Sequence, residues 1–508
     1  MRKLSVLLMS AIVSVAVLFS SCKGNDNDID DPTKTVNLVS QFVYDGMSLY
    51  YLWSSEMEKK QPRVSDSIPG KYFQSVLSST DADHGWSFIT DDVQGLMAEF
   101  AGTPKEFGFS LVFAYANTAQ TEYYAIVKYV FPNSPAYSAG IRRNSVITKI
   151  DGKAITIDNY SGLYGDNAVA LTLQKFVGNQ LIADKEVTIS PSTLSTNPVL
   201  YTEIYETGGK KIAYLFYTDF ISNYNSSLYE AFSRFKQAGV TDLVLDLRYN
   251  HGGAVTAATY LASLIAPRAV VESKSPYARM SYNKELNAYF DEKNISRTDS
   301  LGVFDANLPN PLGANLNLNK VYIIATNDSY SASELTAFCL KSYMNVVHIG
   351  GRTGGKYTAS WTIHPFDEEI GVPIYEGSKM SASLKTKLEN WAMQPIVAKY
   401  TNKSDKDFST PGYLEPDYSL IEGFGYLSAW TQIGDTKDVL LGQALYLITG
   451  DANFKPSMSV APQKIRSSAD ATIRLKNPKE RRSESVLLDN VKLNHEDVDA
   501  IFKSQKAL

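Results

Sequence analysis

The sequence is poor in the residues that build disulfide frameworks and metal centres. It has two cysteines, Cys22 and Cys339, and five histidines among 508 residues. This leaves no disulfide framework and no cysteine-based zinc site, and we expect neither a metal nor another cofactor. The chain also has no excess of basic residues: it contains 49 Lys and Arg and 54 Asp and Glu, which gives a net charge of −5. We therefore expect no nucleic-acid partner.

Long hydrophobic runs are also scarce, and the one at the N-terminus is short for a membrane span. It extends from Leu4 to Phe19, follows two basic residues and ends in two serines before Cys22. This pattern predicts a signal peptide over residues 1–22, and its end resembles a bacterial lipobox with Cys22 lipidated; the alternative is an ordinary signal with an incidental cysteine. Lys23, by resemblance to bacterial lipoproteins, indicates an outer-membrane lipoprotein, periplasmic or surface-facing. Residues 23–34 are polar and acidic, which predicts a flexible linker.

The rest of the chain has enough apolar material for two to four domains. Helical spacing of apolar residues predicts a small N-terminal helical domain over residues 35–92. Short β-rich runs between turn residues predict a second domain over 93–195. Strand and helix patterns alternate over 196–450, which is typical of an α/β fold with a mostly parallel sheet. Residues 451–508 are polar and weakly patterned, and we assign no function to this C-terminal extension.

Individual elements of the α/β part can be predicted from local patterns. Strands are expected over 212–216, 242–247 and 321–326, and helices over 226–237, 257–265, 334–343 and 437–449. Cys339 falls in one of these helices and is expected to be a small buried apolar residue.

A candidate nucleophile, Ser331, lies where the strand over 321–326 runs into the following helix. A serine at such a turn points outward, and the helix N-terminus directs free amides toward a developing oxyanion. A purely structural role is the alternative, because Ser331 and Glu334 also match the pattern of a helix capping box.

A second segment, Gly350-Gly-Arg-Thr-Gly-Gly-Lys356, places one lysine in a glycine-dense turn. Glycines allow close backbone approach, so Lys356 can point inward. A lysine can accept a proton from serine only when its amine is neutral, and burial favours the neutral form. A phosphate-binding loop is the alternative, but the glycine spacing is wrong and neither Ser nor Thr follows the lysine.

A third segment, His251-Gly252-Gly253, follows the end of the strand over 242–247. Its unobstructed amides are a plausible half of an oxyanion hole, and an ordinary turn is an equally good interpretation. Earlier in the chain, Phe107-Gly108-Phe109 and the β-rich runs after it resemble a PDZ domain, in which such a loop binds a peptide's terminal carboxylate. The alternative is that this module only packs against its neighbours and binds no peptide.

Taken together, these segments resemble the C-terminal processing, or tail-specific, serine peptidase family over roughly residues 35–450. Ser331 precedes Lys356 by 25 residues, which matches the family's Ser/Lys pair. The resemblance implies a crotonase-like core in which Ser331 attacks a peptide carbonyl, Lys356 moves the proton, and the amides of Gly252 and Ala332 hold the oxyanion. It also implies a peptide or protein substrate whose C-terminus is selected by the PDZ-like domain.

The chain departs from the family at Ser360, where a glutamine often orients the lysine. Ser360 is therefore expected to take over that role, or Thr358 in its place. A histidine-based triad using His251 or His364 stays open as an alternative. The main rival function is a degenerate, non-catalytic member of the family that binds a peptide without cutting it.

Overall fold

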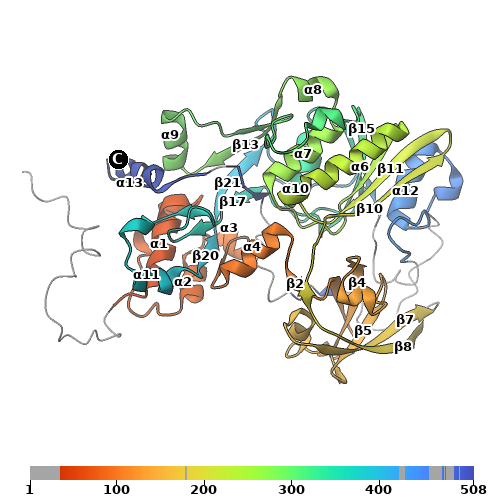
Figure 1. Ribbon diagram of the computed structural model, residues 1–508, viewed down its shortest axis with the longest axis horizontal. Helices are drawn as coiled ribbons and strands as arrows, with labels where there is room; N and C mark the ends of the chain where they lie inside the picture. The colour runs from red at the N-terminus through yellow and green to blue at the C-terminus, as the bar shows by residue number, and fades with distance from the viewer. Residues whose placement is uncertain are drawn as a thin grey trace, which may run out of the picture.

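Figure 1 shows the computed structural model of the chain, which describes residues 35–177, 180–420, 422, 430–456, 472–473, 475, 486–490 and 492–507. The predicted signal peptide and acidic linker lie outside the described residues. Within the described ranges, no helix has both the length and the apolar character needed to cross a membrane.

A six-stranded sheet forms the centre of the α/β part. Its order is β10-β11-β12-β15-β16-β22, and all neighbours pair in parallel except β10 and β11. The strands are β10 (Val199–Thr207), β11 (Lys210–Tyr217), β12 (Asp242–Asp246), β15 (Lys320–Ala325), β16 (Asn345–Gly350) and β22 (Tyr418–Ser419). The prediction of a mostly parallel sheet is thus confirmed, with one antiparallel edge strand that the pattern did not indicate.

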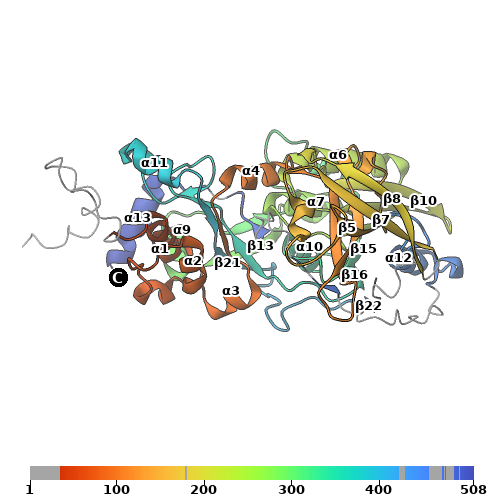
Figure 2. The ribbon, with the colours of Figure 1, turned by 90° about the horizontal axis from the view of Figure 1, so that it is seen from below.

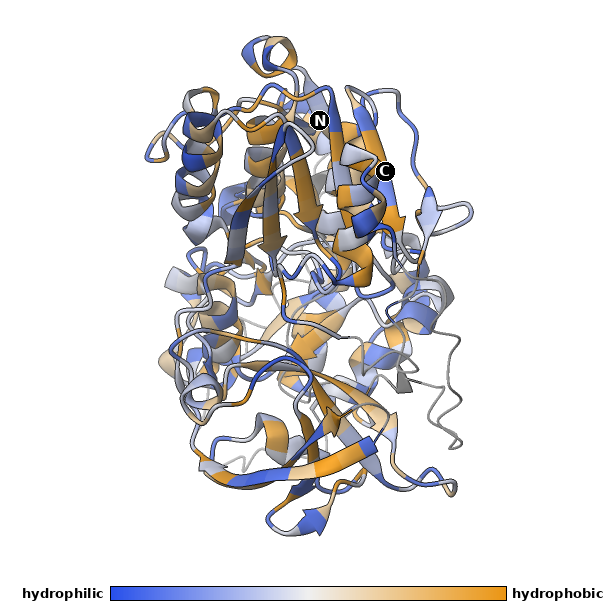
Figure 3. Ribbon diagram, turned by 90° about the vertical axis from the view of Figure 1, so that its right-hand side faces the viewer, coloured by the Kyte–Doolittle hydropathy of each residue, from blue (hydrophilic) through white to orange (hydrophobic). Residues whose placement is uncertain are grey.

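Helices cover both faces of this sheet, which explains why its strands read as continuous apolar runs. On one face lie α6 (Asn225–Ala238), α7 (Val255–Ile265) and α10 (Ala332–Leu340), and on the other lies α12 (Val439–Thr449). Along β11, Ala213, Leu215 and Tyr217 join the first core, while Ile212, Tyr214 and Phe216 join the second. Figure 3 shows the hydrophobic strands enclosed between helices.

Two smaller sheets continue the core toward the N-terminal region. One has the order β14-β13-β21-β17-β24 and the other β1-β20-β18-β19. Their strands are β14 (Thr298–Ser300), β13 (Pro276–Tyr282), β21 (Ile396–Thr401), β17 (Thr358–Ser360), β24 (Val486–Leu487), β1 (Phe88–Thr90), β20 (Ala392–Gln394), β18 (Ile363–His364) and β19 (Val372–Pro373). β17 begins two residues after Lys356, so this sheet helps to position the lysine-bearing turn.

The N-terminal region is helical, as its apolar spacing predicts, and its hydrophobic core is continuous with that of the central sheet. It contains α1 (Leu38–Tyr50), α2 (Pro69–Val76) and α3 (Ser79–His84), followed by α4 (Val93–Ala101). Phe42 and Phe73 belong to the same hydrophobic cluster as Leu245 in the central sheet. The strand β1, which pairs with β20, was not expected from the sequence.

Residues 105–193 form a β-rich module with its own hydrophobic core. Its sheet has the order β23-β3-β4-β5-β7-β8, with β6 beside β5. The elements are β3 (Phe109–Tyr115), β4 (Tyr123–Val130), α5 (Pro135–Ser138), β5 (Val146–Ile150), β6 (Lys153–Ala154), β7 (Val169–Val177) and β8 (Gln180–Ile189), and β2 (Lys105–Glu106) pairs with β9 (Ser192–Thr193) at its neck. Figures 1 and 2 both place this module at the opposite end of the molecule from α1 and α2.

The C-terminal extension contains packed elements that its weak pattern did not indicate. β23 (Thr472–Ile473) joins the β-rich module, and β24 pairs with β17. The last helix, α13 (His495–Ala507), buries Val498 and Ile501 against the main core beside α9 (Lys284–Glu292).

Candidate active site

Ser331 occupies a strained position between β15 and α10. Its backbone has φ 61° and ψ −114°, a conformation that non-glycine residues rarely adopt. Strain of this kind costs on the order of 1–3 kcal/mol and is typical of functional sites. The side chain is fully buried, and its Oγ has no hydrogen-bond partner among the described residues. Ser331 also stands in a capping-box arrangement with Glu334, so its burial and its strained backbone are the features that favour a chemical role.

The turn that carries Ser331 is bonded to the end of β12. Ser329 Oγ donates to the Leu247 carbonyl at 2.7 Å, and Tyr330 N–H donates to the Asn250 carbonyl at 3.1 Å. Ser333 Oγ donates to the same Asn250 carbonyl at 2.9 Å. These bonds fix the Ser331 turn against the segment that leads into Gly252.

Gly252 lies directly against Ser331. A Cβ on Gly252 would be 2.6 Å from Ser331 Cβ and 3.0 Å from the backbone nitrogen of Ala332, and its φ of +106° disfavours any side chain. Ala332 is the first residue of α10, where the N–H groups are not used by the helix. The structure therefore brings together Ser331 and both predicted oxyanion residues. In this structure Gly252 N–H donates to Asn250 Oδ1 at 2.8 Å.

Glu334 connects the serine turn to the lysine turn. Its Oε2 accepts the backbone N–H groups of Ser331 at 2.9 Å and Lys356 at 2.8 Å, and its Oε1 accepts that of Gly355 at 2.8 Å. Burial raises the pKa of the Glu334 carboxyl, against the effect of hydrogen bonds from Thr353 and these N–H groups. The capping-box interpretation thus explains only part of the role of Glu334, because the carboxylate also binds the turn of a distant segment.

Other contacts hold the lysine turn in place. Tyr400 on β21 donates its hydroxyl to the Lys356 carbonyl at 2.9 Å. Leu414 N–H donates to Thr353 Oγ1 at 2.8 Å, and Asp417 accepts the His348 N–H at 2.7 Å. The turn that precedes Lys356 is therefore fixed by the segment over 414–417.

Lys356 is fully buried, as its position in a glycine-rich turn predicts. Its Nζ lies 5.8 Å from the ring centroid of Trp86, which comes from the N-terminal region. Gly355 makes this placement possible, since its φ is +92° and a Cβ there would be 2.2 Å from the Gly412 carbonyl oxygen. Thr358 and Ser360 are both buried on β17, and the orienting role expected for Ser360 stays a prediction.

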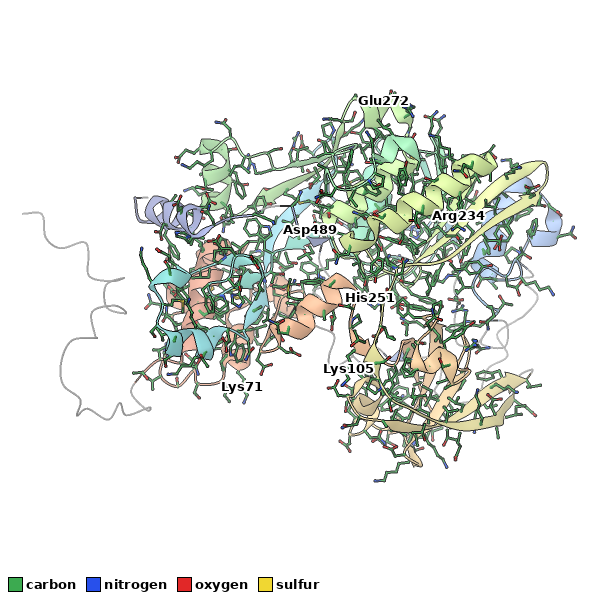
Figure 4. All side chains as sticks on the ribbon, in the orientation of Figure 1. Lys71, Lys105, Arg234, His251, Glu272 and Asp489 are labelled. Carbon is green, nitrogen blue, oxygen red and sulfur yellow. The ribbon has the colours of Figure 1, made fainter. Side chains whose placement is uncertain are left out.

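The two histidines considered as alternative bases lie in different places. His364 on β18 uses Nε2 with the Glu389 carbonyl and Nδ1 with the N–H groups of Phe366 and Asp367, so it is a structural residue. Burial lowers its pKa. His251 precedes Gly252 in sequence and stands edge-on to Tyr330 at 6.2 Å between ring centroids. Figure 4 shows His251 between the central core and the β-rich module.

Two clefts adjoin the site. The larger, of about 1290 Å³, is lined by Phe107, Gly108 and Phe109 of the β-rich module, and by His251 and Tyr330 of the core. The smaller, of about 350 Å³, is lined by Gly252, Gly253 and Trp361 and by residues of the C-terminal extension. His251, Asp219 and Ile221 line both clefts, so the two clefts are neighbours.

A buried charge cluster anchors the strand that leads to Gly252. Arg248 binds Asp246 through Nε and Nη2 and binds both carboxylate oxygens of Asp438. Burial alone would raise the pKa of Asp438, but the charge of Arg248 and its hydrogen bonds, together with the charge of Arg143, outweigh this and lower it. No group of three or more His, Cys, Asp or Glu in the described part of the chain could hold a metal ion.

Several residues of the site carry no local sequence signal. Trp86 and Tyr400 reach Lys356 from distant segments, and nothing in their own surroundings points to it. The bridging role of Glu334 is hidden behind its capping-box position. A serine with positive φ is also invisible in a sequence, because this backbone conformation normally favours glycine.

Comparison with known proteins gives consistent matches. The family model described as Peptidase family S41 matches residues 211–420, and Peptidase S41 N-terminal domain matches residues 39–88. A carboxyl-terminal-processing protease of Picosynechococcus sp. is 24% identical over 328 residues, which is 63% of this chain and 66% of that protein. A chloroplastic C-terminal processing peptidase of Tetradesmus obliquus is 26% identical over 44% of this chain and 46% of that protein. The alignments thus span less than two thirds of the length of these relatives.

Among solved structures, a candidate S41 protease from Bacteroides fragilis NCTC 9343 is similar over most of its length. It aligns with a TM-score of 0.63 and 28% identity, and it covers 80% of this chain and 97% of the solved chain. The similarity therefore extends beyond the two segments that the family models match.

Proposed function

Because the chain belongs to the peptidase S41 family, we propose that it is a serine endopeptidase that cleaves peptides or unfolded proteins with Ser331 and Lys356. The observation that carries this proposal is the packing of Gly252 against Ser331 and the Ala332 nitrogen, next to a turn that buries Lys356. This supports a candidate nucleophile and two candidate amide donors at the N-terminus of α10, and Glu334 bonds the turn that carries the candidate base to the same helix end.

The proposed reaction follows from the groups present. Ser331 Oγ attacks the peptide carbonyl carbon while its proton passes to the neutral Lys356 amine, and the carbonyl oxygen gains charge beside Ala332 N–H and Gly252 N–H. The tetrahedral intermediate collapses when Lys356 returns the proton to the departing nitrogen, which leaves an acyl group on Ser331. A water molecule then attacks the ester with Lys356 as base again, and the free carboxylate and serine are released.

Two hydrogen-bonding features of the site would have to change before this reaction could proceed. Ser331 Oγ lacks a hydrogen-bond partner among the described residues, and Gly252 N–H is engaged by Asn250 Oδ1. Catalytic hydrogen bonds often form only when substrate is bound. The same two features favour the rival function, a peptide-binding protein without catalysis, so an experiment must separate the two.

Cleavage of an unfolded protein substrate separates them. The wild type should cleave reduced, unfolded casein, whereas Ser331→Ala and Lys356→Arg should not, because a guanidinium stays charged and cannot act as base. Cleavage by neither the wild type nor the variants, together with binding of casein by all three, would establish the non-catalytic binder. Undiminished cleavage by Ser331→Ala would overturn the assignment of the nucleophile.

The remaining parts of the proposal concern architecture. We propose that the domains divide as the sequence indicates, at residues 35–92, 93–195 and 196–450, that the last of these is a crotonase-like core, and that the β-rich module is PDZ-like. Support for the last point comes from Phe107, Gly108 and Phe109, which stand at the start of β3 and line the larger cleft. Selection of peptide C-termini by this loop can be tested by comparing cleavage of a peptide with a free carboxylate and of its amidated form.

Export and lipidation are proposed from the sequence alone. Cys22 is proposed as the lipidated residue of an outer-membrane lipoprotein, with the bacterial membrane as partner. Metabolic labelling with an alkyne fatty acid should mark the wild type and not Cys22→Ala, and equal labelling of both would contradict the proposal.

A further inference from the structure

Trp86 brings the N-terminal region against the turn that carries Lys356. Its side chain is buried, and Lys356 Nζ lies over its ring at 5.8 Å from the centroid. The Trp86 ring also meets Tyr357, the residue after Lys356, edge-on at 5.5 Å between ring centroids. An ammonium group within about 6 Å of a tryptophan ring face is attracted by the negative potential of that face. The N-terminal region therefore places an aromatic ring beside the proposed base.

A buried carboxylate fixes the segment that carries Trp86. Asp81 accepts the Ser87 N–H at 2.9 Å and Ser87 Oγ at 2.5 Å, and Tyr51 donates its hydroxyl to the same carboxylate at 2.7 Å. Ser87 Oγ in turn accepts the Ile396 N–H of β21 at 2.9 Å. Figures 1 and 2 both show α3, which contains Asp81, beside β21. The residue next to Trp86 is thus bonded to α3 and to β21 at once, which holds the ring in its place over Lys356.

The elements packed around Lys356 carry several other titratable groups. They are Glu334 on α10, Tyr400 and Lys399 on β21, Tyr357 next in sequence, and Asp81 and His84 in the N-terminal region. The Glu334 carboxylate accepts three backbone N–H groups, and Asp81 is engaged by Ser87 and Tyr51. A carboxylate against the amine would hold it in the charged form at rest, so that it could not accept a proton. A ring face favours the charge more weakly and takes no proton itself, which fits a base that is first neutral and then charged.

We propose that Trp86 is a positioning residue for the reaction, whose ring face stabilises the positive charge that Lys356 gains when it takes the proton of Ser331. The inference rests on the proposed function, because it gives the N-terminal region a part in that proton transfer. Lys356 is buried, so solvent does little to stabilise the new charge. An interaction made only with the charged form lowers the barrier, since the charge develops on the way to the transition state. Contacts of this kind are worth roughly twofold to thirtyfold.

Trp86→Leu tests this role, because leucine keeps the place apolar and removes the ring face. On the alkaline plateau, where Lys356 is neutral in the free enzyme, kcat/KM for an internally quenched decapeptide should fall about fivefold. On the acidic limb kcat/KM should change little, because the charged ground state loses the same interaction as the transition state. The midpoint of the pH profile should therefore move to lower pH, by about 0.7 unit for a fivefold effect. Trp86→Phe keeps a weaker ring and should fall between the two.

Trp53→Leu is the matched control, since it removes the same ring from the same region. Trp53 packs on Tyr51 at 5.2 Å between ring centroids, and its loss should leave the midpoint of the pH profile unchanged. If Trp86→Leu does not fold, fluorinated tryptophans incorporated at position 86 replace it. They keep the shape of the ring while each fluorine weakens its negative face, so the plateau rate should fall with each fluorine added.

Three results would overturn the inference. An equal fall of kcat/KM at every pH, with an unchanged midpoint, would show that Trp86 only supports the fold. A midpoint that moves to higher pH in Trp86→Leu would show that the ring excludes water from the amine and does not stabilise its charge. A plateau rate that is insensitive to fluorination would show that the ring potential plays no part.

A readout without catalysis separates this inference from the proposed function. In the Ser331→Ala background, the ¹³C resonance of the Lys356 Cε, identified by its loss in Lys356→Met, reports the charge of the amine as pH is varied. Trp86→Leu should move the midpoint of this titration to lower pH as well. If no protein cleaves any peptide while this shift is found, the charge-stabilising role of the ring is supported and the peptidase assignment fails. If the wild type cleaves peptides and the titration does not move, the peptidase assignment stands and the inference is wrong.

Discussion

Ser331 and Lys356 donate their backbone N–H groups to one and the same carboxylate oxygen, Glu334 Oε2, at 2.9 and 2.8 Å. The backbones of the proposed nucleophile and the proposed base are thereby positioned by one third residue, Glu334. The carboxylate sits at the start of α10, where negative charge is favourable. Local helix capping and long-range assembly of the site are therefore performed by one side chain.

Glu334→Gln should disable the site without removing a proposed catalytic residue. An amide has one acceptor oxygen in place of two, so at least one of the three N–H groups now bound would face an NH₂ group. We expect the free energy of unfolding to fall by about 1–3 kcal/mol and kcat/KM to fall tenfold or more. Urea unfolding and peptide cleavage measure the two effects. Glu58→Gln, at an exposed position, should change neither, and a Glu334→Gln variant with full activity would contradict the bridging role.

Gly252→Ala should abolish activity by a steric route. The new Cβ would lie 2.6 Å from Ser331 Cβ and 2.7 Å from its Oγ, in the space proposed for the oxyanion. The backbone at φ +106° adds strain for alanine. Gly70→Ala in α2 is the matched control, since a Cβ there meets nothing within 4 Å. Equal peptide cleavage by the two alanine variants would show that Gly252 does not face the reaction.

Ser331→Gly should be more stable than Ser331→Ala, although both should be inactive. Glycine adopts φ 61° and ψ −114° freely, whereas alanine keeps the strain of the serine. We expect a difference of about 1 kcal/mol, less than the full strain because glycine loses more entropy on folding. Thermal unfolding of the two variants side by side measures it. A less stable glycine variant would show that the turn stores no strain at this residue.

The stability of the protein should depend on pH through Asp299. Burial, with a contribution from Asp489, raises the pKa of Asp299 to about 7 from 3.8, against a hydrogen bond from Asn490. Between these two values the folded protein keeps a proton that the unfolded chain has lost, so stability falls as pH rises from about 4 to 7.

This dependence can be isolated by comparing melting temperatures at pH 5 and pH 8 in the Ser331→Ala background. Asp299→Asn should reduce the difference between the two temperatures, because its amide does not titrate. The exposed Asp83→Asn should leave the difference as it is. The prediction fails if Asp299→Asn shows the full pH dependence of its parent.

The sequence predicts the parts of this molecule that depend on local pattern. The strand before Ser331, the helix after it and the glycine turn before Lys356 all lie close to where their patterns indicate, because periodicity and turn residues report on neighbouring positions. The helix over 334–343 is displaced toward its N-terminus, to Ala332–Leu340, since Ser331 itself forms its cap. The resemblance, not the pattern, linked Ser331 to Lys356.

The long-range features could not be predicted in this way. Whether a carboxylate such as Glu334 binds a turn 22 residues away depends on the tertiary fold. The strands β23 and β24 are two residues long, too short for any periodicity, and both exist only because β3 and β17 offer them an edge. Residues 451–508 accordingly look featureless in sequence, although the described residues 472–473 and 486–487 pair with β3 and β17.

The most direct test of the account is the covalent labelling of Ser331. Wild-type protein treated with a fluorophosphonate probe should gain one label, and peptide mapping by mass spectrometry should place it on Ser331, with labelling greatly slowed in Lys356→Arg. A label on another residue, or none on a protein that cleaves casein, would contradict the account.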